Sequence, residues 1–331
     1  STREHDVVIV YINTTGLAEG TYSGDIIINS NGGNGTFTVT FNVSTPSIVY
    51  VDDDYNSSTP GWGYDHFASI QESVDAVAVG GTVNVYSGVY NENVDISKTL
   101  SLIGESKSTT IINSSSSNAV SISANSVNIS GFTIRNATEE GIYVESASNC
   151  NISNNIIYGN GGNGILLNLS SNNTIFANVV HNNSYDGILL ENSSYNDVIR
   201  NNVYWNGIGN NGEGILLMYS NHCNITNNEA YENGEDGIIL EPYSSYNNVS
   251  DNEVYGNADC GILISGNSNN NTIYNNTAYN NTFDGILIEK SSGNEIIKNS
   301  IHNNSQEGIY LLSASNNTIK ENFIENNNGY G

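Results

Sequence analysis

Short runs of apolar residues recur along this chain at a nearly constant interval. The motif Gly-Ile-x-Leu, or a close variant of it, is found eight times, and successive glycines lie 23, 23, 27, 23, 24, 24 and 23 residues apart. The repeated glycines are Gly141, Gly164, Gly187, Gly214, Gly237, Gly261, Gly285 and Gly308. A fixed interval of this size indicates a solenoid in which each repeat is one supersecondary element.

Each repeat contains three short apolar runs, separated by Asn, Ser and Gly. The interval is too short for a helix pair of the usual repeat sizes, and Ile and Val dominate the apolar runs, so we expect strands. One repeat is therefore predicted to be one coil of an all-β, parallel β-helix. From residue 82 onward, roughly eleven coils would stack about 4.8 Å apart. The Ile after each repeated glycine, and the residue two positions later, are expected to form the core.

Two further columns consist mainly of asparagine. Asn tolerates left-handed turn geometry, and stacked side-chain amides can bond from coil to coil, so we interpret both columns as structural. The first column is Asn155, Asn178, Asn202, Asn228, Asn252, Asn276, Asn299 and Asn322. The second is Cys150, Asn173, Asp197, Cys223, Asn247, Asn271, Asn294 and Asn317.

The segment Ser170-Ser-Asn-Asn-Thr-Ile175, followed by Asn178, Asn183 and Asp186-Gly187-Ile188, resembles a known repeat pattern. The pattern is that of the right-handed parallel β-helix repeat proteins, which are pectin-lyase-like. They include copper-binding maturation proteins of nitrous oxide reductase, carbohydrate-associated sugar-hydrolase-type repeats and archaeal cell-surface proteins. The resemblance covers roughly residues 48–331 and implies a right-handed β-helix. It leaves activity open, because the same coil serves lyases, hydrolases, adhesins and scaffolds.

The sequence divides into three segments. Residues 1–46 contain alternating strand patterns at 8–12, 25–28 and 36–41 and look like part of an immunoglobulin-like β-sandwich. Residues 47–81 look like the entry segment of the β-helix family, with an amphipathic helix predicted over about 65–78 that caps the solenoid. Residues 82–331 are the β-helix. Because residues 1–46 hold too few strands for a closed sandwich and no cap follows the last coil, we expect a fragment of a longer chain, or ends completed by neighbouring subunits.

Composition limits the partners. The chain has 8 basic and 34 acidic residues, a formal charge of -26, which argues against nucleic acid, anionic membrane surfaces and polyuronate substrates. No apolar stretch is long enough to insert into a membrane. Cys150 and Cys223 lie three coils apart, too far for a disulfide, so we expect free, mostly buried thiols. An extracellular or cell-surface location is expected.

Three outward columns carry the candidate chemistry. The first is an apolar stripe, which we expect a partner to cover through self-association. The second is an aromatic column, whose rings can stack on sugars or only on one another. The third is an acidic column that precedes the repeated glycines. The stripe is Tyr143, Leu166, Leu189, Leu216, Ile239, Leu263, Leu287 and Tyr310. The glycan-stacking candidates are Tyr158, His181, Trp205, Tyr231, Tyr255, Tyr279 and His302. The acids are Glu140, Asp186, Glu213, Asp236, Asp284 and Glu307.

Two kinds of modification or ligand are expected. The carboxylates of Asp52, Asp53 and Asp54 are a candidate calcium site, with a solvated loop as the alternative. Sequons predict covalent N-glycans if the protein is secreted. The candidate acceptors are Asn13, Asn56, Asn136, Asn182, Asn192, Asn248, Asn280 and Asn303.

An enzymatic site is not found in the pattern. Arg3, Arg135 and Arg200 are the only arginines, and none accompanies a carboxylate cluster, while the acids repeat evenly like structural elements. One Met and five scattered His residues give no copper site. We therefore expect a non-enzymatic extracellular structural protein, a glycosylated subunit of a surface layer, sheath or filament. The alternative is a glycan-binding or glycan-processing β-helix protein that contacts a polysaccharide.

Overall fold

The computed structural model describes residues 9–12 and 19–329, and the chain forms two compact units, residues 1–46 and 47–331. In the first unit, β1 (Gly20–Ser30) and β2 (Gly33–Val43) form a long antiparallel hairpin. Residues 9–12 lie in no strand, so the strand predicted at 8–12 is wrong over that part, and residue 8 lies outside the described residues. The two strands pair only with each other within this described part. The immunoglobulin-like interpretation stays a prediction.

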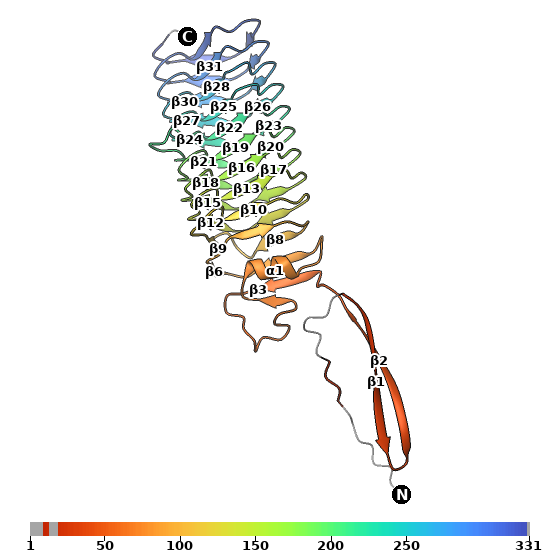
Figure 1. Ribbon diagram of the computed structural model, residues 1–331. Coiled ribbons are helices and arrows are strands. Elements are labelled where there is room, and N and C mark those ends of the chain that lie inside the picture. Colours follow the sequence, from red (N-terminus) through yellow and green to blue (C-terminus); the bar gives the residue numbers. More distant parts are fainter. Residues whose placement is uncertain (1–8, 13–18, 330–331) are drawn as a thin grey trace. The chain divides into compact units, whose positions relative to one another are not determined.

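The second unit is a parallel β-solenoid with three sheets, one along each side of the coil (Figure 1). The first sheet contains β7 (Val94–Ile96), β10 (Val120–Ile122), β13 (Ile142–Glu145), β16 (Ile165–Asn168), β19 (Ile188–Glu191), β22 (Ile215–Met218), β25 (Ile238–Leu240), β28 (Ile262–Ile264), β31 (Ile286–Glu289) and β34 (Ile309–Leu312). The second sheet contains β3 (Ile48–Val51), β4 (His66–Phe67), β5 (Thr82–Val85), β8 (Ser101–Gly104), β11 (Asn128–Ser130), β14 (Asn151–Ser153), β17 (Thr174–Phe176), β20 (Asp197–Ile199), β23 (Asn224–Thr226), β26 (Asn248–Ser250), β29 (Thr272–Tyr274), β32 (Glu295–Ile297) and β35 (Thr318–Lys320). The third sheet contains β6 (Gly88–Tyr90), β9 (Thr110–Asn113), β12 (Thr133–Arg135), β15 (Ile156–Tyr158), β18 (Val179–His181), β21 (Asn202–Tyr204), β24 (Glu229–Tyr231), β27 (Glu253–Tyr255), β30 (Thr277–Tyr279), β33 (Ser300–His302) and β36 (Phe323–Glu325).

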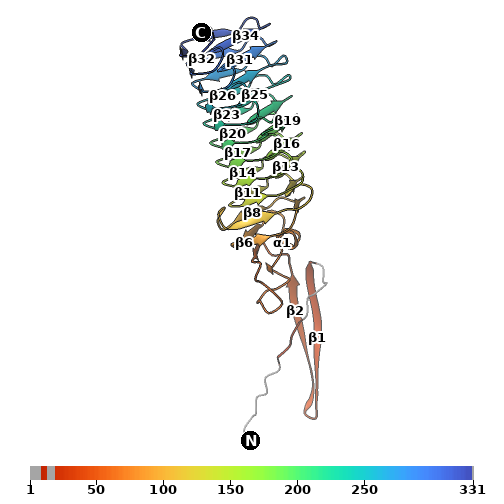
Figure 2. The ribbon, with the colours of Figure 1, turned by 90° about the vertical axis from the view of Figure 1, so that its left-hand side faces the viewer.

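Equivalent residues of successive coils stack directly above one another. Ile142 pairs with Ile165, which pairs with Ile188, and all three side chains are fully buried. The predicted β-helix with coils of about 23 residues is confirmed, and its coils stack one on another (Figure 2). The core formed by the repeated Ile is also confirmed. Because strand side chains alternate, the residue between two buried positions of each strand points outward.

Side-chain amides tie the turns of one coil to the next. The Asn178 Oδ1 accepts hydrogen bonds from the backbone N–H of Asn155 at 3.0 Å and from its Nδ2 at 3.2 Å. The Asn178 Nδ2 donates to the Ile152 carbonyl at 2.9 Å. Asparagine therefore pairs backbone groups that the turns leave without strand partners, which confirms the structural interpretation of these columns.

Two more columns with the same role were missed in the sequence. One consists of Asn160, Asn183, Asn206, Asn233, Asn257, Asn281, Asn304 and Asn327, which bond from coil to coil at the turn from the third sheet to the first. The other is a serine column, in which the Ser193 hydroxyl accepts from the Ser170 backbone and donates to the Leu167 carbonyl.

The predicted columns are displaced by one residue in the longest coil. Asn201, and not Asn202, accepts from the Asn178 backbone at 3.0 Å, and Asn196, and not Asp197, accepts from Asn173 at 2.7 Å. The extra residues of this 27-residue coil lie in the turn after Asn206, so the strands before that turn keep the 23-residue interval.

The helix α1 (Ile70–Ala76) is shorter than predicted. Its N-terminal end is capped by Ser69 and by the Glu92 carboxylate, which accepts from the backbone of Ile70 at 2.8 Å. It cannot begin at residue 65 because β4 pairs with β3 there, and it ends where Val77 becomes extended. The helix packs against β7, the terminal strand of the first sheet, as a cap. None of the helices in the described part of the chain is long and apolar enough to cross a membrane.

Loss of one amide from these columns is expected to be costly. In Asn228→Ala, the buried backbone N–H of Asn201 and the carbonyl of Val198 lose their partners. We expect a decrease of about 3–5 kcal/mol in the free energy of unfolding, measured by urea denaturation. Asn128→Ala is the control, because this exposed side chain bonds only to the Ser101 hydroxyl, and it should cost less than about 0.5 kcal/mol. Equal losses in both variants would contradict this account.

Candidate functional site

An aromatic ladder runs along the outer face of the third sheet. Its rings stack nearly parallel with centroids 4.8–5.1 Å apart, and each ring is half-buried. The ladder is Tyr158, His181, Tyr204, Tyr231, Tyr255, Tyr279 and His302. Since neighbouring rings cover each other's faces, the ladder offers mainly ring edges to a ligand.

Trp205 does not belong to the ladder, although the sequence pattern placed it there. His181 pairs with Tyr204, and Trp205 follows in the turn, in left-handed backbone geometry with φ 54°. The same one-residue displacement that affects Asn201 causes this difference. The indole N–H of Trp205 donates to Glu232 instead of stacking in the column.

A second set of rings projects from the turn between the first and second sheets, and we name it the aromatic edge. It consists of Tyr195, Tyr219, His222, Tyr243 and Tyr246. Tyr195, His222 and Tyr246 form one stack, with centroids 4.9 and 5.2 Å apart, and Tyr219 and Tyr243 form another at 6.0 Å. The four tyrosines are 44–57% exposed, so these rings project further into solvent than the half-buried rings of the ladder.

Both stacks end partway along the solenoid, in the same coil. The next residues in the two columns are Asn267 and Asn270, whose side chains are shorter than a tyrosine ring. The outer parts of the Tyr243 and Tyr246 rings are therefore left uncovered on the side that faces the following coils. Each ring is 57% exposed.

A shallow polar groove of about 300 Å³ continues from this point along the same turn. Its lining consists of amide and hydroxyl side chains and one lysine, namely Asn267, Asn269, Lys290, Ser291, Ser292, Ser313 and Ser315. Lys290 pairs with Glu289 at 2.5 Å. An exposed ring face beside hydrogen-bonding groups is the combination that a sugar requires, because a sugar has an apolar ring face and polar hydroxyls.

The strand patterns of the sequence do not predict the aromatic edge, because its residues lie in the turns. The available signal was a pair of aromatic residues three positions apart in successive turns, as in Tyr219 and His222, then Tyr243 and Tyr246. The groove has no comparable signal, because its Asn and Ser residues resemble those of every other turn.

The apolar stripe lies on the outer face of the first sheet, as its strand register requires. Leu216 and Ile239 are only 8% and 3% exposed, Tyr310 is 39% exposed, and the other members are half-buried. Leucine side chains of adjacent coils cover much of each other's surface. Coverage of the stripe by a partner stays a prediction.

The acidic column lies largely inside the turn between the third and first sheets. In four of its members a side-chain oxygen accepts from the backbone N–H one coil further on, as Asp186 does from Glu213 at 2.8 Å and Glu213 from Asp236 at 2.5 Å. Burial raises the pKa of Asp186 to about 6, and burial together with Asp236 raises the pKa of Glu213. These carboxyl groups act as coil-to-coil bonding groups like the Asn side chains, and burial favours their protonated form.

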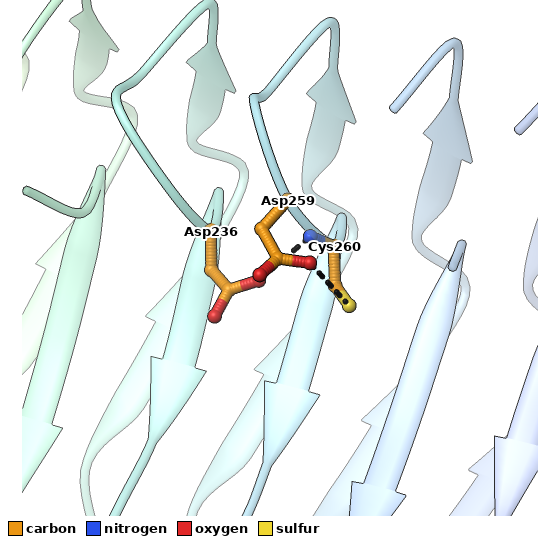
Figure 3. Close-up of side chains that lie close together, drawn as sticks. All are labelled: Asp236, Asp259 and Cys260. Atoms are coloured by element: carbon orange, nitrogen blue, oxygen red, sulfur yellow. Dashed lines mark hydrogen bonds between the residues drawn. The ribbon is translucent and has the colours of Figure 1, made fainter. Parts of the chain in front are cut away.

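One group of possible metal ligands occurs in the described residues, formed by Asp236, Asp259 and Cys260, whose ligand atoms lie within 4.8 Å of one another (Figure 3). The Asp236 carboxylate accepts from the Cys260 backbone at 2.7 Å, and the thiol donates to Asp259 at 3.4 Å. Burial raises the pKa of the Cys260 thiol, as it raises that of Cys223 to about 11. The raised thiol pKa opposes the deprotonation that binding of a soft metal requires, and this set offers fewer oxygen ligands than calcium takes.

The three aspartates of the predicted calcium site are not brought together within the described part of the chain. Asp52 accepts from the Asp54 backbone at 3.1 Å in a local turn, and Asp53 accepts from the backbone of Val89 in β6 at 3.3 Å, so the two carboxylates have different roles. Of the sequons, Asn13 lies outside the described residues and Asn248 is half-buried. The exposed sequon asparagines are Asn56, Asn136, Asn182, Asn192, Asn280 and Asn303. Cys150, Cys223 and Cys260 are buried free thiols.

Two family models match the chain. One is described as "Right handed beta helix region" and matches residues 194–324, and the other is described as "Periplasmic copper-binding protein (NosD)" and matches residues 70–210. Together they cover most of the solenoid. No curated protein matches the chain. The residues present do not fit copper, because the one ligand group of the described residues contains no histidine or methionine beside its single thiol.

Several solved structures share the fold. The Dettilon tailspike protein has a TM-score of 0.66 at 16% identity, over 85% of this chain and 62% of the tailspike chain, so this chain spans about three fifths of it. The A-module of the Azotobacter vinelandii mannuronan C-5 epimerase AlgE4 has a TM-score of 0.60 at 16% identity, over 83% and 97% of the two chains. Pectate lyase Pel9A has a TM-score of 0.55 at 17% identity, over 85% and 80%.

These comparisons contradict the expectation that the protein is not an enzyme. An epimerase module and a pectate lyase are both built on this fold. The even repetition of the acids is a property of the coil, and it does not exclude a catalytic site elsewhere on the solenoid. At identities of 16–17%, the likeness itself shows the fold alone.

Because of its buried carboxyl groups, the free energy of unfolding of the solenoid should fall as pH rises. Asp186 has an ordinary pKa near 4 when unfolded and about 6 when folded, so the folded state holds more protons between these values. The contribution of Asp186 to the free energy of unfolding is fully present below pH 4. It is lost as pH rises through 6, a decrease of about 3 kcal/mol. Thermal denaturation should give a higher melting temperature at pH 4.5 than at pH 8. A higher value at pH 8 would contradict the assignment.

Replacing one buried acid by its amide should remove part of this dependence. Glu213→Gln keeps an oxygen that accepts from the Asp236 backbone, and its amide does not titrate. Asn163 already fills this role in the same column, where its amide oxygen accepts from the Asp186 backbone. We expect a gain of about 1–3 kcal/mol at pH 8 and little change at pH 4.5, measured by urea denaturation at both values. Glu295→Gln, an exposed carboxylate, is the control and should change neither. A gain independent of pH would contradict the assignment.

Proposed function

Because the chain belongs to the right-handed parallel β-helix repeat proteins, we propose that it is an extracellular glycan-recognising protein that binds at the aromatic edge and the polar groove. The observation that carries this proposal is the end of the two ring stacks at Tyr243 and Tyr246, directly beside the groove that begins at Asn267. A sugar ring would pack on the uncovered tyrosine faces, and its hydroxyls would bond to the amides and serines of the next two coils.

The charge of the molecule favours a neutral glycan. The net charge of -26 repels polyanions, and Lys290, the one charged residue lining the groove, is already paired with Glu289. Amide and hydroxyl groups donate and accept hydrogen bonds without requiring charge on the ligand. Because coils stack along the solenoid axis, the edge and groove run along that axis, and an extended polysaccharide would follow it.

The extracellular location is part of this proposal, supported by the periplasmic protein after which one family model is named. N-glycans on the exposed sequons are proposed with it, because they require the same location. The role of a subunit in a surface layer, sheath or filament rests on the apolar stripe alone. The geometry of the edge and groove supports glycan recognition better.

Truncating one ring at the end of the edge should weaken glycan binding. In Tyr243→Ala, the free ring face beside Asn267 is lost, and we expect the dissociation constant to increase on the order of fivefold to tenfold, equivalent to about 1–1.4 kcal/mol. A glycan array of neutral and acidic oligosaccharides would identify the ligand. Isothermal titration calorimetry with the best neutral oligosaccharide would then measure the affinity.

Tyr185→Ala is the matched control, because Tyr185 is 53% exposed on a different turn of the coil. It should leave the affinity unchanged. An equal loss in both variants, or array signals confined to polyanions, would overturn the proposal. Incubation of the same glycans with the protein, followed by chromatography of their chain length, tests processing alongside binding.

A further inference from the structure

The outer face of the first sheet carries a column of mainly aliphatic side chains, whereas the outer column of the third sheet is a ladder of stacked rings. From Tyr143 to Tyr310, every outward residue at the centre of these strands is apolar. The same column begins with Asp95 and Ser121 in the first two coils, so the fold itself does not require apolar residues there. In the second sheet, which has the same strand geometry, the outward positions are mixed, with polar residues such as Asn151 and apolar residues such as Phe176.

The stripe is long and lies uncovered within residues 47–329. Eight coils at about 4.8 Å span about 34 Å. Parallel sheets usually carry helices on both faces, because both faces are apolar. Here α1 contacts β7 at the end of the sheet, and no described helix or second sheet packs on the outer face of β13 to β34. Leu216 and Ile239, in the middle of the stripe, are only 8% and 3% exposed, so the accessible part of the stripe lies mainly in the coils before and after them.

A row of carboxylates follows the stripe on the same face. Side chains two residues apart in a strand point the same way, and four stripe positions are followed at that distance by glutamate. These are Glu145, Glu191, Glu241 and Glu289. Of the three ion pairs in the described residues, only that of Glu289 with Lys290 involves this row. The stripe is thus an apolar surface with a largely uncompensated negative border.

We infer that the stripe is the docking surface for an amphipathic helix of another protein, with Lys or Arg beside its apolar face. The apolar residues of the helix would bury the leucines, and its basic residues would pair with the glutamate row. A helix of about 22 residues would span the eight coils at 1.5 Å per residue. A second copy of this chain is disfavoured, because each copy carries a net charge of -26.

A synthetic 22-residue helical peptide, with leucines on one face and lysines on both borders, is the probe. Its affinity would be measured by fluorescence anisotropy at several salt concentrations, against the same peptide with glutamate in place of lysine. We expect only the lysine peptide to bind, and Leu189→Gln to weaken binding about tenfold or more. Glu191→Gln should weaken it less and reduce its salt dependence, because it removes one charge pair.

Glu295→Gln on the second sheet is the control, since it removes the same charge from a different face. It should leave the affinity unchanged. Circular dichroism would check folding, and Leu263→Thr would replace Leu189→Gln if that variant is unfolded. Equal binding to the wild type and the leucine variant would overturn the inference, since binding would then follow net charge alone. Light scattering that shows a dimer, dissociated by Leu189→Gln, would overturn it in favour of a second copy.

Discussion

The structure depends on pairing the backbone groups at the turns of each coil. The strands of a parallel solenoid bond to the strands above and below, but the turns leave N–H and C=O groups inside the molecule, where water cannot reach them. Asn, Ser and buried Asp or Glu side chains satisfy them from the adjacent coil, as Asn178 does for Asn155. This constraint fixes the register, and the register places like residues above like residues along the whole length.

The chemistry of the surface follows from these columns. Where aromatic residues continue through seven coils, as in the ladder from Tyr158 to His302, each ring covers the next and little ring face remains. Where a column of rings stops, as at Tyr243 and Tyr246, a face is exposed beside shorter polar side chains. A binding site on a solenoid therefore arises at an interruption of a column more readily than along a continuous one.

The sequence predicted the repeating features and missed the interruptions. The Gly-Ile interval and strand alternation identified the buried Ile142 column, because burial imposes one residue type on every coil. The register of Asn201 and Tyr204 could not be read, since the interval alone does not show in which turn extra residues lie. Burial of Glu213 was also hidden, because an acidic residue in a turn is usually exposed, and only the fold shows that its carboxyl oxygen accepts a backbone bond as an Asn oxygen does. The groove depends on the relative lengths of side chains in adjacent coils.

The most direct measurement is hydrogen–deuterium exchange with and without a bound neutral oligosaccharide. Glycan recognition at the aromatic edge and groove predicts slower exchange in the turns that carry Tyr243, Asn267 and Lys290, with no change in the turn that carries Tyr185. Protection that instead followed the ladder on the third sheet, or the stripe on the first, would contradict the assignment of the site.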